Sequence, residues 1–371
     1  SGRPFPTFDE LRGHVNPAGR SHVNDVDVDV SDFDEEAPTN PGTTAHAAIP
    51  AGHFERGRST LIDGDGNVRL TWHKTTVSNE QRLEQLVAAV TNPETWARID
   101  RADEQPAPPV SDDDLMAVYV LGDPHIGLQS WAAEVGEDFD LKIAERDLTA
   151  AVAHLVDVAD PAKLGVIVSL GDYFHVDSEA GTTTKGTRQD CDTRWTKMLQ
   201  AGIRAMRTCI EAALRKHERV RVICIIGNHD RHASAVLSIA LAQFYEDNPR
   251  VDVDTSPDPF HWIRFGAVLL GITHGDEAKP DKLPGVMACD RASDWGETTH
   301  RAWLCGHVHH ASVKEYPGVI VETFPTLAAR DRWHHGAGYR SQRSMVVQVY
   351  HREWGPWRRS TIGIQQLRSG A

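Results

Sequence analysis

The sequence has few cysteines, and these follow no recognisable pattern. The five Cys, at positions 191, 209, 224, 289 and 305, form no CxxC pair and no framework spacing. This distribution argues against a disulfide-stapled secreted scaffold and against a structural zinc site built on Cys. Reduced thiols in a cytoplasmic compartment are the simplest interpretation.

Long apolar runs and an excess of positive charge are also missing. No apolar segment approaches about 18 residues and the N-terminus is polar, so we expect no transmembrane helix, no signal peptide and no membrane partner. The formal net charge is −14, which excludes a general polyanion binder of the basic-patch kind. Any contact with nucleic acid must therefore be local, and two bound divalent ions would themselves add about +4 at such a site.

Composition divides the chain into four segments. Residues 1–57, rich in Pro, Gly, Asp and His, predict an acidic extended or disordered arm. Residues 58–102 predict a small element made of a β-hairpin and a helix that begins after Ser78, either a winged-helix-like remnant or a cover or docking element. Residues 103–114 contain three Pro and three consecutive Asp and indicate a linker, and residues 115–371 are long enough for one large domain.

Within residues 115–371, apolar strand-like runs alternate with amphipathic helical patterns. We expect strands at 115–121, 164–170 and 220–226, and helices at 140–158, 189–216 and 233–245. The later strands, at 260–265, 267–273, 302–305, 313–316, 319–323 and 344–350, are closely spaced and include hairpins. The pattern predicts an α/β fold with two packed mixed β-sheets flanked by helices.

Short polar motifs follow five of these apolar runs. They are Asp123-Pro124-His125, Gly171-Asp172, Gly227-Asn228-His229-Asp230, Thr273-His274-Gly275-Asp276 and Gly306-His307-Val308-His309. Because neighbouring strands present their ends along one edge of a sheet, these side chains are expected to converge. Carboxylate, imidazole and amide oxygen are mixed N/O ligands suited to catalytic divalent ions. Two such ions need a bridging carboxylate, for which Asp172 is the natural candidate.

The ordered motifs resemble those of the calcineurin-like metallophosphoesterase superfamily over roughly residues 115–330. The resemblance implies a four-layer α/β/β/α sandwich with a small N-terminal appendage, and a pair of divalent ions, Mn²⁺ first, with Fe²⁺, Zn²⁺, Ni²⁺ or Co²⁺ as alternatives. It implies a first metal held by Asp123, His125, Asp172 and His309. It implies a second metal held by Asp172, Asn228, His274 and His307.

The same resemblance assigns His229 a catalytic role without metal ligation. In the family this His contacts the scissile phosphate, and Asp230 is expected to orient it, so that His229 stabilises the oxyanion or protonates the leaving group. The reaction implied is hydrolysis of a phosphoester by a metal-activated hydroxide.

Several residues outside the motifs are candidate substrate contacts. His175 follows the bridging Asp172 closely and is a group that supports the metal ligands, a substrate contact, or a loop His packed near the site. Lys185 and Arg188 lie in a loop of small residues that is able to approach a phosphate. Arg330 begins a C-terminal region in which Arg alternates with Trp and Tyr, residue types that clamp phosphates and stack bases but also pack on ordinary β surfaces. His232 and the pair His334-His335 are interpreted as polar loop residues.

The most specific functional expectation is a phosphodiesterase or nuclease that acts on DNA or nucleic-acid ends. The segments Asp123-Pro124-His125-Ile126-Gly127 and Gly171-Asp172-Tyr173-Phe174 resemble those of DNA-repair nucleases, and the chain also resembles bacteriophage-encoded predicted exonucleases. The expected location is the cytoplasm, that of the host if the protein is phage-encoded. Repair nucleases usually carry a DNA-capping region and a coiled-coil attachment, and little chain remains after residue 310 for either. The alternatives are a phosphodiesterase or phosphomonoesterase for a small nucleotide, a partner-binding scaffold with vestigial metals, and DNA binding through the hairpin-helix element. The oligomeric state stays open.

Overall fold

The computed structural model describes residues 53–63, 65–77, 107–108 and 110–369, which divide into two compact units. The first unit, Ser1–Thr76, contains a two-stranded sheet of β1 (His53–Ile62) and β2 (Val68–Val77). The Asp63 carboxylate accepts hydrogen bonds from the amides of Asp65 and Asn67, which closes the turn. The predicted hairpin is confirmed, although β1 begins inside the segment that we assigned to the acidic arm. The helix expected after Ser78 and residues 1–52 lie outside the described residues.

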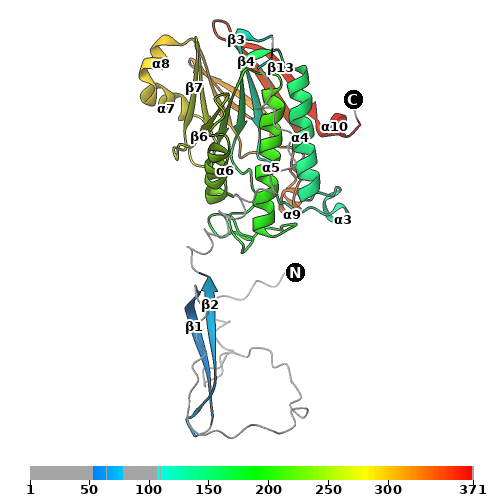
Figure 1. The fold of residues 1–371 in the computed structure, drawn as a ribbon, viewed down its shortest axis with the longest axis vertical. Coiled ribbons are helices and arrows are strands. Elements are labelled where there is room, and N and C mark those ends of the chain that lie inside the picture. The colour runs from blue at the N-terminus through cyan, green and yellow to red at the C-terminus, as the bar shows by residue number, and fades with distance from the viewer. Residues whose placement is uncertain (1–52, 64, 78–106, 109, 370–371) are drawn as a thin grey trace, which may run out of the picture. The chain divides into compact units, whose positions relative to one another are not determined.

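The second unit, Val77–Ala371, contains a six-stranded mixed sheet (Figure 1). Its strand order is β13-β12-β3-β4-β5-β6. The bounds are β3 (Asp112–Leu121), β4 (Ala162–Ser169), β5 (Arg219–Cys224), β6 (Val251–Asp254), β12 (Ser344–His351) and β13 (Gly355–Gly363). Strands β3 to β6 are parallel to one another, and β12 and β13 extend the sheet in antiparallel fashion.

A five-stranded mixed sheet packs against the first. Its strand order is β10-β11-β9-β8-β7. The bounds are β7 (His261–Phe265), β8 (Val268–Thr273), β9 (His300–Cys305), β10 (Ser312–Tyr316) and β11 (Val319–Thr323). Alternate side chains of β3, among them Met116 and Val118, fill the space between the sheets with residues such as Leu270 and Leu304. The period-2 alternation of a strand thus gives each sheet one face toward the other.

Helices cover the outer face of each sheet. The bounds are α3 (Ala132–Val135), α4 (Leu141–Val158), α5 (Trp195–Leu214), α6 (Arg231–Phe244), α7 (Leu283–Asp290), α8 (Ala292–Glu297), α9 (Arg332–Gly336) and α10 (Ile364–Ser369). Helices α4, α5 and α6 lie on the side of the six-stranded sheet, and α7 and α8 lie on the other side of the domain (Figure 1). The predicted four-layer sandwich is therefore confirmed.

Most sequence-predicted elements occur within a few residues of their expected bounds. Helix α4 begins after Asp140, whose carboxylate accepts the amide of Ile143 at 2.7 Å and caps the first turn. The prediction for residues 189–216 was too long, because α5 starts only at Trp195. The sequence interpretation did not include β6, β13, α3, α7, α8, α9 or α10.

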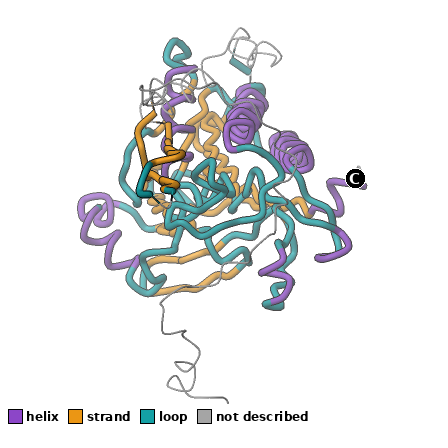
Figure 2. The backbone as a smooth tube through the Cα atoms, turned by 90° about the horizontal axis from the view of Figure 1, so that it is seen from below, coloured by secondary structure: helices purple, strands orange, loops and turns teal. Residues whose placement is uncertain are grey.

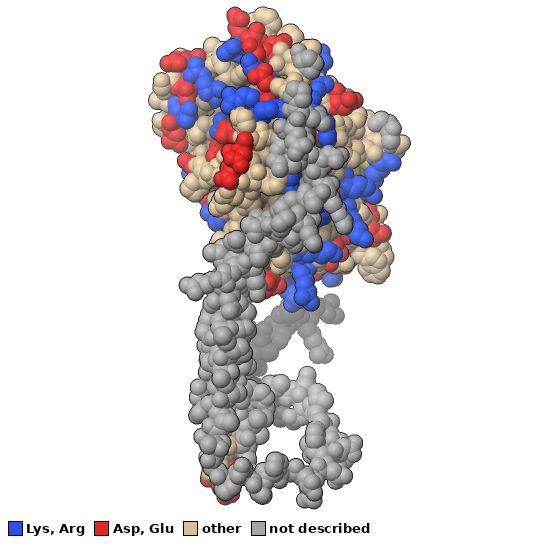
Figure 3. Space-filling model, in the orientation of Figure 1, with Lys and Arg blue, Asp and Glu red and all other residues tan. Residues whose placement is uncertain are grey.

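Surface charge, cysteine state and helix hydrophobicity agree with the expectations from composition. Lys and Arg are interspersed with Asp and Glu on the face of the domain that Figure 3 shows. All five cysteines lie in the described part of the chain, and each is a free thiol. Among the described residues, no helix has both the length and the apolar character needed to cross a membrane. Figure 2 views the domain from below, where loops occupy the centre of the projection.

Candidate metal centre

Five strands of the two sheets deliver the polar motifs to one edge. Asp123, Asp172 and Asn228 follow the ends of β3, β4 and β5, while His274 and His307 follow β8 and β9. Backbone hydrogen bonds join the loops: the His125 amide donates to the Asp172 carbonyl at 3.0 Å, and the Gly306 amide donates to the His274 carbonyl at 2.9 Å. The predicted convergence of the motifs is therefore present in the fold.

Two glycines allow this close approach. A Cβ on Gly227 would lie 2.1 Å from Asp172 Oδ1, and a Cβ on Gly306 would lie 2.6 Å from Asp123 Oδ1. Neither position accommodates a side chain without displacing a candidate ligand. The glycines in two of the motifs are therefore needed for the space around the two carboxylates.

The backbone is strained at the candidate ligands. Within the described residues, five non-glycine residues have positive φ, and all five are predicted metal ligands. They are Asp123, His125, Asp172, His307 and His309, with φ values between 40° and 68°. The left-handed region costs an L-residue roughly 1–2 kcal/mol, and strain of this kind persists only where the surrounding structure enforces it. Its coincidence with the ligand positions marks a functional site.

Three side chains form one half of the centre. His125 Nε2 lies 3.0 Å from His309 Nε2, and His309 Nε2 lies 3.7 Å from Asp123 Oδ2. Ligand atoms held at about 2.0–2.2 Å from one ion are separated from one another by roughly 3 Å. The spacing therefore suits a shared ion, as predicted for the first metal.

Four side chains form the other half. His274 Nε2 lies 3.1 Å from Asn228 Oδ1 and 3.2 Å from Asp172 Oδ2, and the His274 and His307 rings are 5.0 Å apart. The Nδ1–H of His274 donates to the Leu170 carbonyl at 2.7 Å, which leaves Nε2 facing the ligand group. Asp172, His274 and His307 have ligand atoms within 4.8 Å of one another. These four residues are those predicted for the second metal.

Burial determines the protonation of the imidazoles. Burial lowers the pKa of His175 to about 3 and that of His309 to about 3, and it places the pKa of His125 well below its ordinary value. Each ring is therefore neutral and keeps the lone pair that metal ligation requires. Burial alone would also lower the pKa of His274, but Asp172 and Asp123 raise it to about 10.

The pKa values of the Asp123 and Asp172 carboxyl groups shift in opposite directions. Burial raises the pKa of Asp123 to about 8, an effect that His274 opposes and the negative charge of Asp172 reinforces. For Asp172 burial is outweighed by the charge and hydrogen bond of His274 and by the His229 amide, so its pKa falls below the ordinary range. Neither Asp123 oxygen accepts a hydrogen bond among the described residues, although the side chain is fully buried. A buried carboxylate in this state fits a divalent cation.

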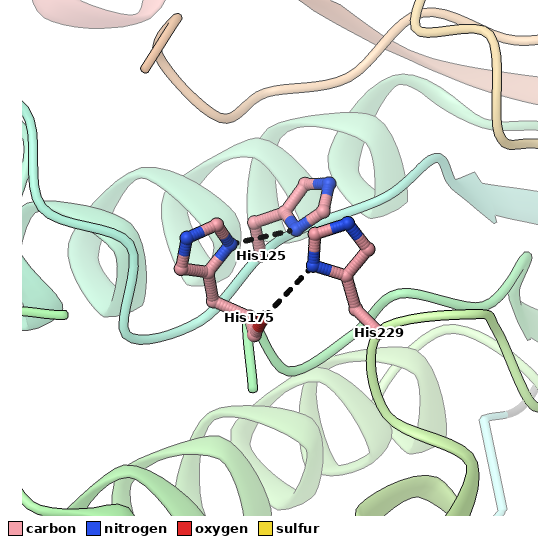
Figure 4. A group of neighbouring side chains, drawn as sticks. All are labelled: His125, His175 and His229. Carbon is pink, nitrogen blue, oxygen red and sulfur yellow. Dashed lines mark hydrogen bonds between the residues drawn. The ribbon is translucent and has the colours of Figure 1, made fainter. Parts of the chain in front are cut away.

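His229 lies at the centre of the site beside two other imidazoles. His125, His175 and His229 point toward one another (Figure 4), and their ligand atoms lie within 4.8 Å. The Nδ1–H of His229 donates to the His175 carbonyl at 2.9 Å, so its Nε2 is left for a ligand and lies 4.0 Å from Asp172 Oδ2. His175 Nδ1 lies 3.2 Å from His125 Nδ1. The geometry thus brings His175 closer to the ligands than the sequence indicated.

The expectation that Asp230 orients the His229 ring is wrong. The Asp230 carboxylate accepts the amides of Phe174 at 2.9 Å and Gly227 at 3.1 Å, and the Ser234 hydroxyl at 2.6 Å. The His229 ring is oriented by the His175 carbonyl instead. Asp230 therefore joins the backbones of two motif loops from behind the site.

Two pockets open onto the centre. A cavity of about 990 Å³ is lined by Arg188 and aromatic residues, and a smaller one of about 340 Å³ is lined by Lys185. Asn228, His229 and His307 line both pockets. Thus the structure brings the predicted contacts Lys185 and Arg188 to the site.

Arg330 is not brought to the site. It is absent from the lining of both described pockets, and its guanidinium donates to the Tyr339 carbonyl at 3.5 Å. Other arginines of the C-terminal region also have structural partners: Arg343 pairs with Glu137, and Arg358 pairs with Asp160 at 3.0 Å. The proposed role of Arg330 as a substrate contact is therefore not supported by its position.

Two sets of residues near the site were missed. His334, interpreted as a polar loop residue, stacks on His309 with ring centroids 4.9 Å apart, and Asp331 holds its Nδ1 at 2.8 Å. The spacing Asp331 to His334 is that of a helix N-cap, a signal that was available in the sequence. Asp177 accepts the amides of His232 and Ala233 and ties the loop after β4 to the start of α6. No local signal indicated this long-range cap.

A family comparison agrees with the order of the motifs along the chain. A model of the calcineurin-like phosphoesterase family matches residues 116–311. Similar solved structures include the phosphoesterase Yfce from E. coli (16% identity, 66% of this chain and 98% of that chain, TM-score 0.34). A novel archaeal phosphodiesterase (12%, 67% and 99%, TM-score 0.34) and Vacuolar Protein Sorting 29 from Cryptosporidium parvum (14%, 68% and 100%, TM-score 0.31) are also similar. No curated protein matches the chain.

The family match covers more than half of the 371 residues and includes all five motifs that carry candidate ligands. The solved structures are too distant to indicate an activity. The chain belongs to the calcineurin-like phosphoesterase family.

Proposed function

We propose that this protein is a dinuclear-metal-dependent phosphodiesterase that acts on DNA or nucleic-acid ends. The observation that carries the proposal is the edge at which seven N/O donors converge on strained backbone around two buried carboxylates, Asp123 and Asp172. A structural role alone does not account for carboxylates buried with so little hydrogen bonding at Asp123. A catalytic metal centre does.

The residues fit a pair of divalent ions. Asp123, His125 and His309 would hold one ion, while Asn228, His274 and His307 would hold the other, with Asp172 between them. Two such ions supply Lewis-acid polarisation of a phosphoryl group and activation of water. The ligand set is compatible with Mn²⁺, our first choice, and with Fe²⁺, Zn²⁺, Ni²⁺ or Co²⁺.

His229 is the proposed catalytic residue outside the ligand set. Its Nδ1–H is committed to the His175 carbonyl, so Nε2 is the atom available to the phosphate. His229 lines both pockets, which is where a substrate phosphorus with two ester arms would lie. We assign Nε2 to stabilising the developing charge and passing a proton to the leaving oxygen.

The two pockets support a diester rather than a monoester. They share Asn228, His229 and His307, while Arg188 lines only the larger pocket and Lys185 only the smaller one. Each of the two ester groups of a diester would occupy one pocket. The side chains of Arg188 and Lys185 supply local positive charge on a chain whose formal net charge is −14. Together with the resemblance of the motif sequences, the two pockets favour a nuclease of the DNA-repair or bacteriophage type.

A small-nucleotide phosphodiesterase is the second candidate. The larger cavity, about 990 Å³, has the size of a site for a single small ligand. A screen with Mn²⁺ across single-stranded DNA, duplex DNA, RNA and cyclic nucleotides separates the two. Faster turnover of bis-p-nitrophenyl phosphate than of p-nitrophenyl phosphate supports the diesterase, and the reverse order refutes it.

Metal content and turnover measured together test the mechanism. We expect His229→Ala to keep its metal, measured by mass spectrometry, while turnover of bis-p-nitrophenyl phosphate falls roughly 10²- to 10⁴-fold. Asp172→Asn should lose metal. His154→Ala, on α4 and outside the lining of both pockets, is the control and should behave as wild type. Full activity in chelated enzyme contradicts the proposal.

A further inference from the structure

Two aromatic side chains stand exposed at the rim of the larger pocket. Trp333, on α9, is 64% exposed and Tyr339, just beyond α9, is 40% exposed, and both line the cavity that reaches the candidate metal centre. Their rings are 5.6 Å apart and inclined by 33°. Large aromatic side chains left in water beside a polar site indicate a ligand with an apolar face.

A continuous series of ring contacts joins this rim to the metal ligands. His309 stacks on His334 at 4.9 Å, and His334 contacts Trp333 at 4.9 Å and Tyr339 at 5.3 Å. Trp333 therefore lies two ring contacts from a candidate ligand. A group joined to the reacting phosphate through a single sugar spans a distance of this order.

Hydrogen bonds within the chain hold the rim in place. The Asp331 carboxylate accepts the His334 amide at 2.7 Å and caps α9, and the Tyr339 amide donates to the His334 carbonyl at 3.0 Å. Two rings with few rotatable bonds on a closed turn lose little conformational entropy when they bind. Such a preformed aromatic surface suits a planar ligand.

We propose that Trp333 and Tyr339 form a nucleobase-stacking subsite beside the scissile phosphate. The inference deepens the proposed phosphodiesterase function and names its substrate class as nucleotide esters. Arg188 lines the same cavity and supplies a cation for a neighbouring phosphate. Stacking requires only the π-face of a base, so the subsite accepts all four bases.

A second exposed aromatic pair serves as a matched control. Trp354 and Trp357 are 57% and 50% exposed, but Trp354 lies in the turn between β12 and β13 and Trp357 lies near the start of β13. The end of β12 pairs with Leu115, near the start of β3, whereas the ligands follow the end of β3. Trp354 thus has the exposure of Trp333 without its proximity to the site.

The test compares esters with the same leaving group. Thymidine 5′-p-nitrophenyl phosphate and thymidine 3′-p-nitrophenyl phosphate each carry a base, and methyl p-nitrophenyl phosphate carries none. With the Mn²⁺-loaded full chain, we expect kcat/KM for one thymidine ester to exceed that for the methyl ester by about 5-fold or more, which corresponds to one base–aromatic stack. The p-nitrophenyl group is common to all three and cancels in the ratio.

The variants locate the effect. Trp333→Ala should abolish the preference for the thymidine ester over the methyl ester, and Trp333→Phe should retain most of it. Trp354→Ala should leave the preference unchanged. A thymidine preference that survives in Trp333→Ala, Tyr339→Ala and their double variant overturns the subsite, and so does the lack of any preference in wild type.

The outcome stays informative if the proposed function is wrong. Hydrolysis of the methyl ester without a base effect refutes the subsite and leaves the phosphodiesterase standing. If wild type hydrolyses none of the esters, the function fails, and calorimetric titration with thymidine 5′-monophosphate then tests the subsite alone. Weaker binding in Trp333→Ala than in wild type and Trp354→Ala supports it, and equal or undetectable binding in all three overturns it.

Discussion

Removal of the Asp177 carboxylate should release a substrate-binding loop and leave the metal ligands in place. Asp177 is buried, and its Oδ1 accepts the amides of Ala233 at 2.8 Å and His232 at 3.0 Å, at the start of α6. Its Oδ2 accepts the Thr184 hydroxyl at 2.7 Å. One carboxylate therefore caps a helix and anchors the loop that contains Lys185.

The magnitude follows from these contacts. A hydrogen bond to a charged group contributes about 1.5–3 kcal/mol, and loss of an N-cap costs about 0.5–2 kcal/mol, so Asp177→Ala should lower the free energy of unfolding by about 3 kcal/mol. In Asp177→Asn the amide oxygen still accepts the helix amides, and its NH₂ faces the Thr184 hydroxyl, so the expected loss is about 1 kcal/mol. We expect KM for bis-p-nitrophenyl phosphate to rise about 10-fold in Asp177→Ala, about the value of one charge-assisted contact.

Urea unfolding, steady-state kinetics and metal content together test whether Asp177 anchors the loop. Glu179→Gln, an exposed position in the same loop, is the control and should match wild type in all three measurements. An unchanged unfolding midpoint in Asp177→Ala refutes the anchoring role. Loss of metal in that variant also refutes the reasoning, because the carboxylate would then support the metal centre rather than the loop.

Three further predictions concern glycine positions, ligand strain and acid stability. Gly227→Ala should lose metal, because its Cβ would lie 2.1 Å from Asp172 Oδ1. Gly296→Ala is the control: no atom lies within 4 Å of the added carbon, so mass spectrometry should find the metal content of wild type. Asp123→Gly should raise the thermal unfolding midpoint of the chelated protein, because it relieves about 1–2 kcal/mol of backbone strain at φ 40°. Added Mn²⁺ should stabilise wild type but not this variant. A lower midpoint in the chelated variant contradicts the strain argument. Burial lowers the pKa of His217 to about 4, so the neutral ring favours the fold above pH 6.5 and this stability is lost as pH falls toward 4. The buried His125, His175 and His309 add losses of the same sign, so we expect the loss between pH 7 and pH 5, measured by urea unfolding, to be about 2 kcal/mol smaller in His217→Gln than in wild type. An equal acid loss in the variant assigns the sensitivity to other groups.

The strands and helices that build the core were predictable because their hydrophobic patterns are continuous. Strand β11 occupies the predicted residues, and α4 begins one residue after the predicted start at Asp140. In contrast, β6 and β13 are edge strands with few apolar residues, and β13 includes Pro356 and a run of exposed side chains. Their strand conformation depends on pairing with a neighbouring strand, which a local pattern does not reveal.

The candidate ligands were predictable for a different reason than the walls of the site. Each ligand follows directly from a strand end, so local sequence order encodes its place along the sheet edge. Trp333 and His334 lie more than twenty residues beyond the last motif, and they reach the site only because α9 lies over His309. Likewise, nothing local separates Arg188, which lines the pocket, from Arg358, which pairs with Asp160. The identity of a pocket wall is a tertiary property.

The strained ligand backbone and the sheets that flank it have to be considered together. Asp123 and Asp172 adopt left-handed conformations at the ends of β3 and β4, and the two strands pair in parallel through fully buried residues up to that point. The hydrogen bond from the His125 amide to the Asp172 carbonyl then joins the strained loops directly. The paired strands therefore fix where the ligand loops leave the sheet and sustain the strained backbone there. The aromatic rim of Trp333 and Tyr339 is held by the separate cap of α9, so its position does not depend on the strained ligand loops.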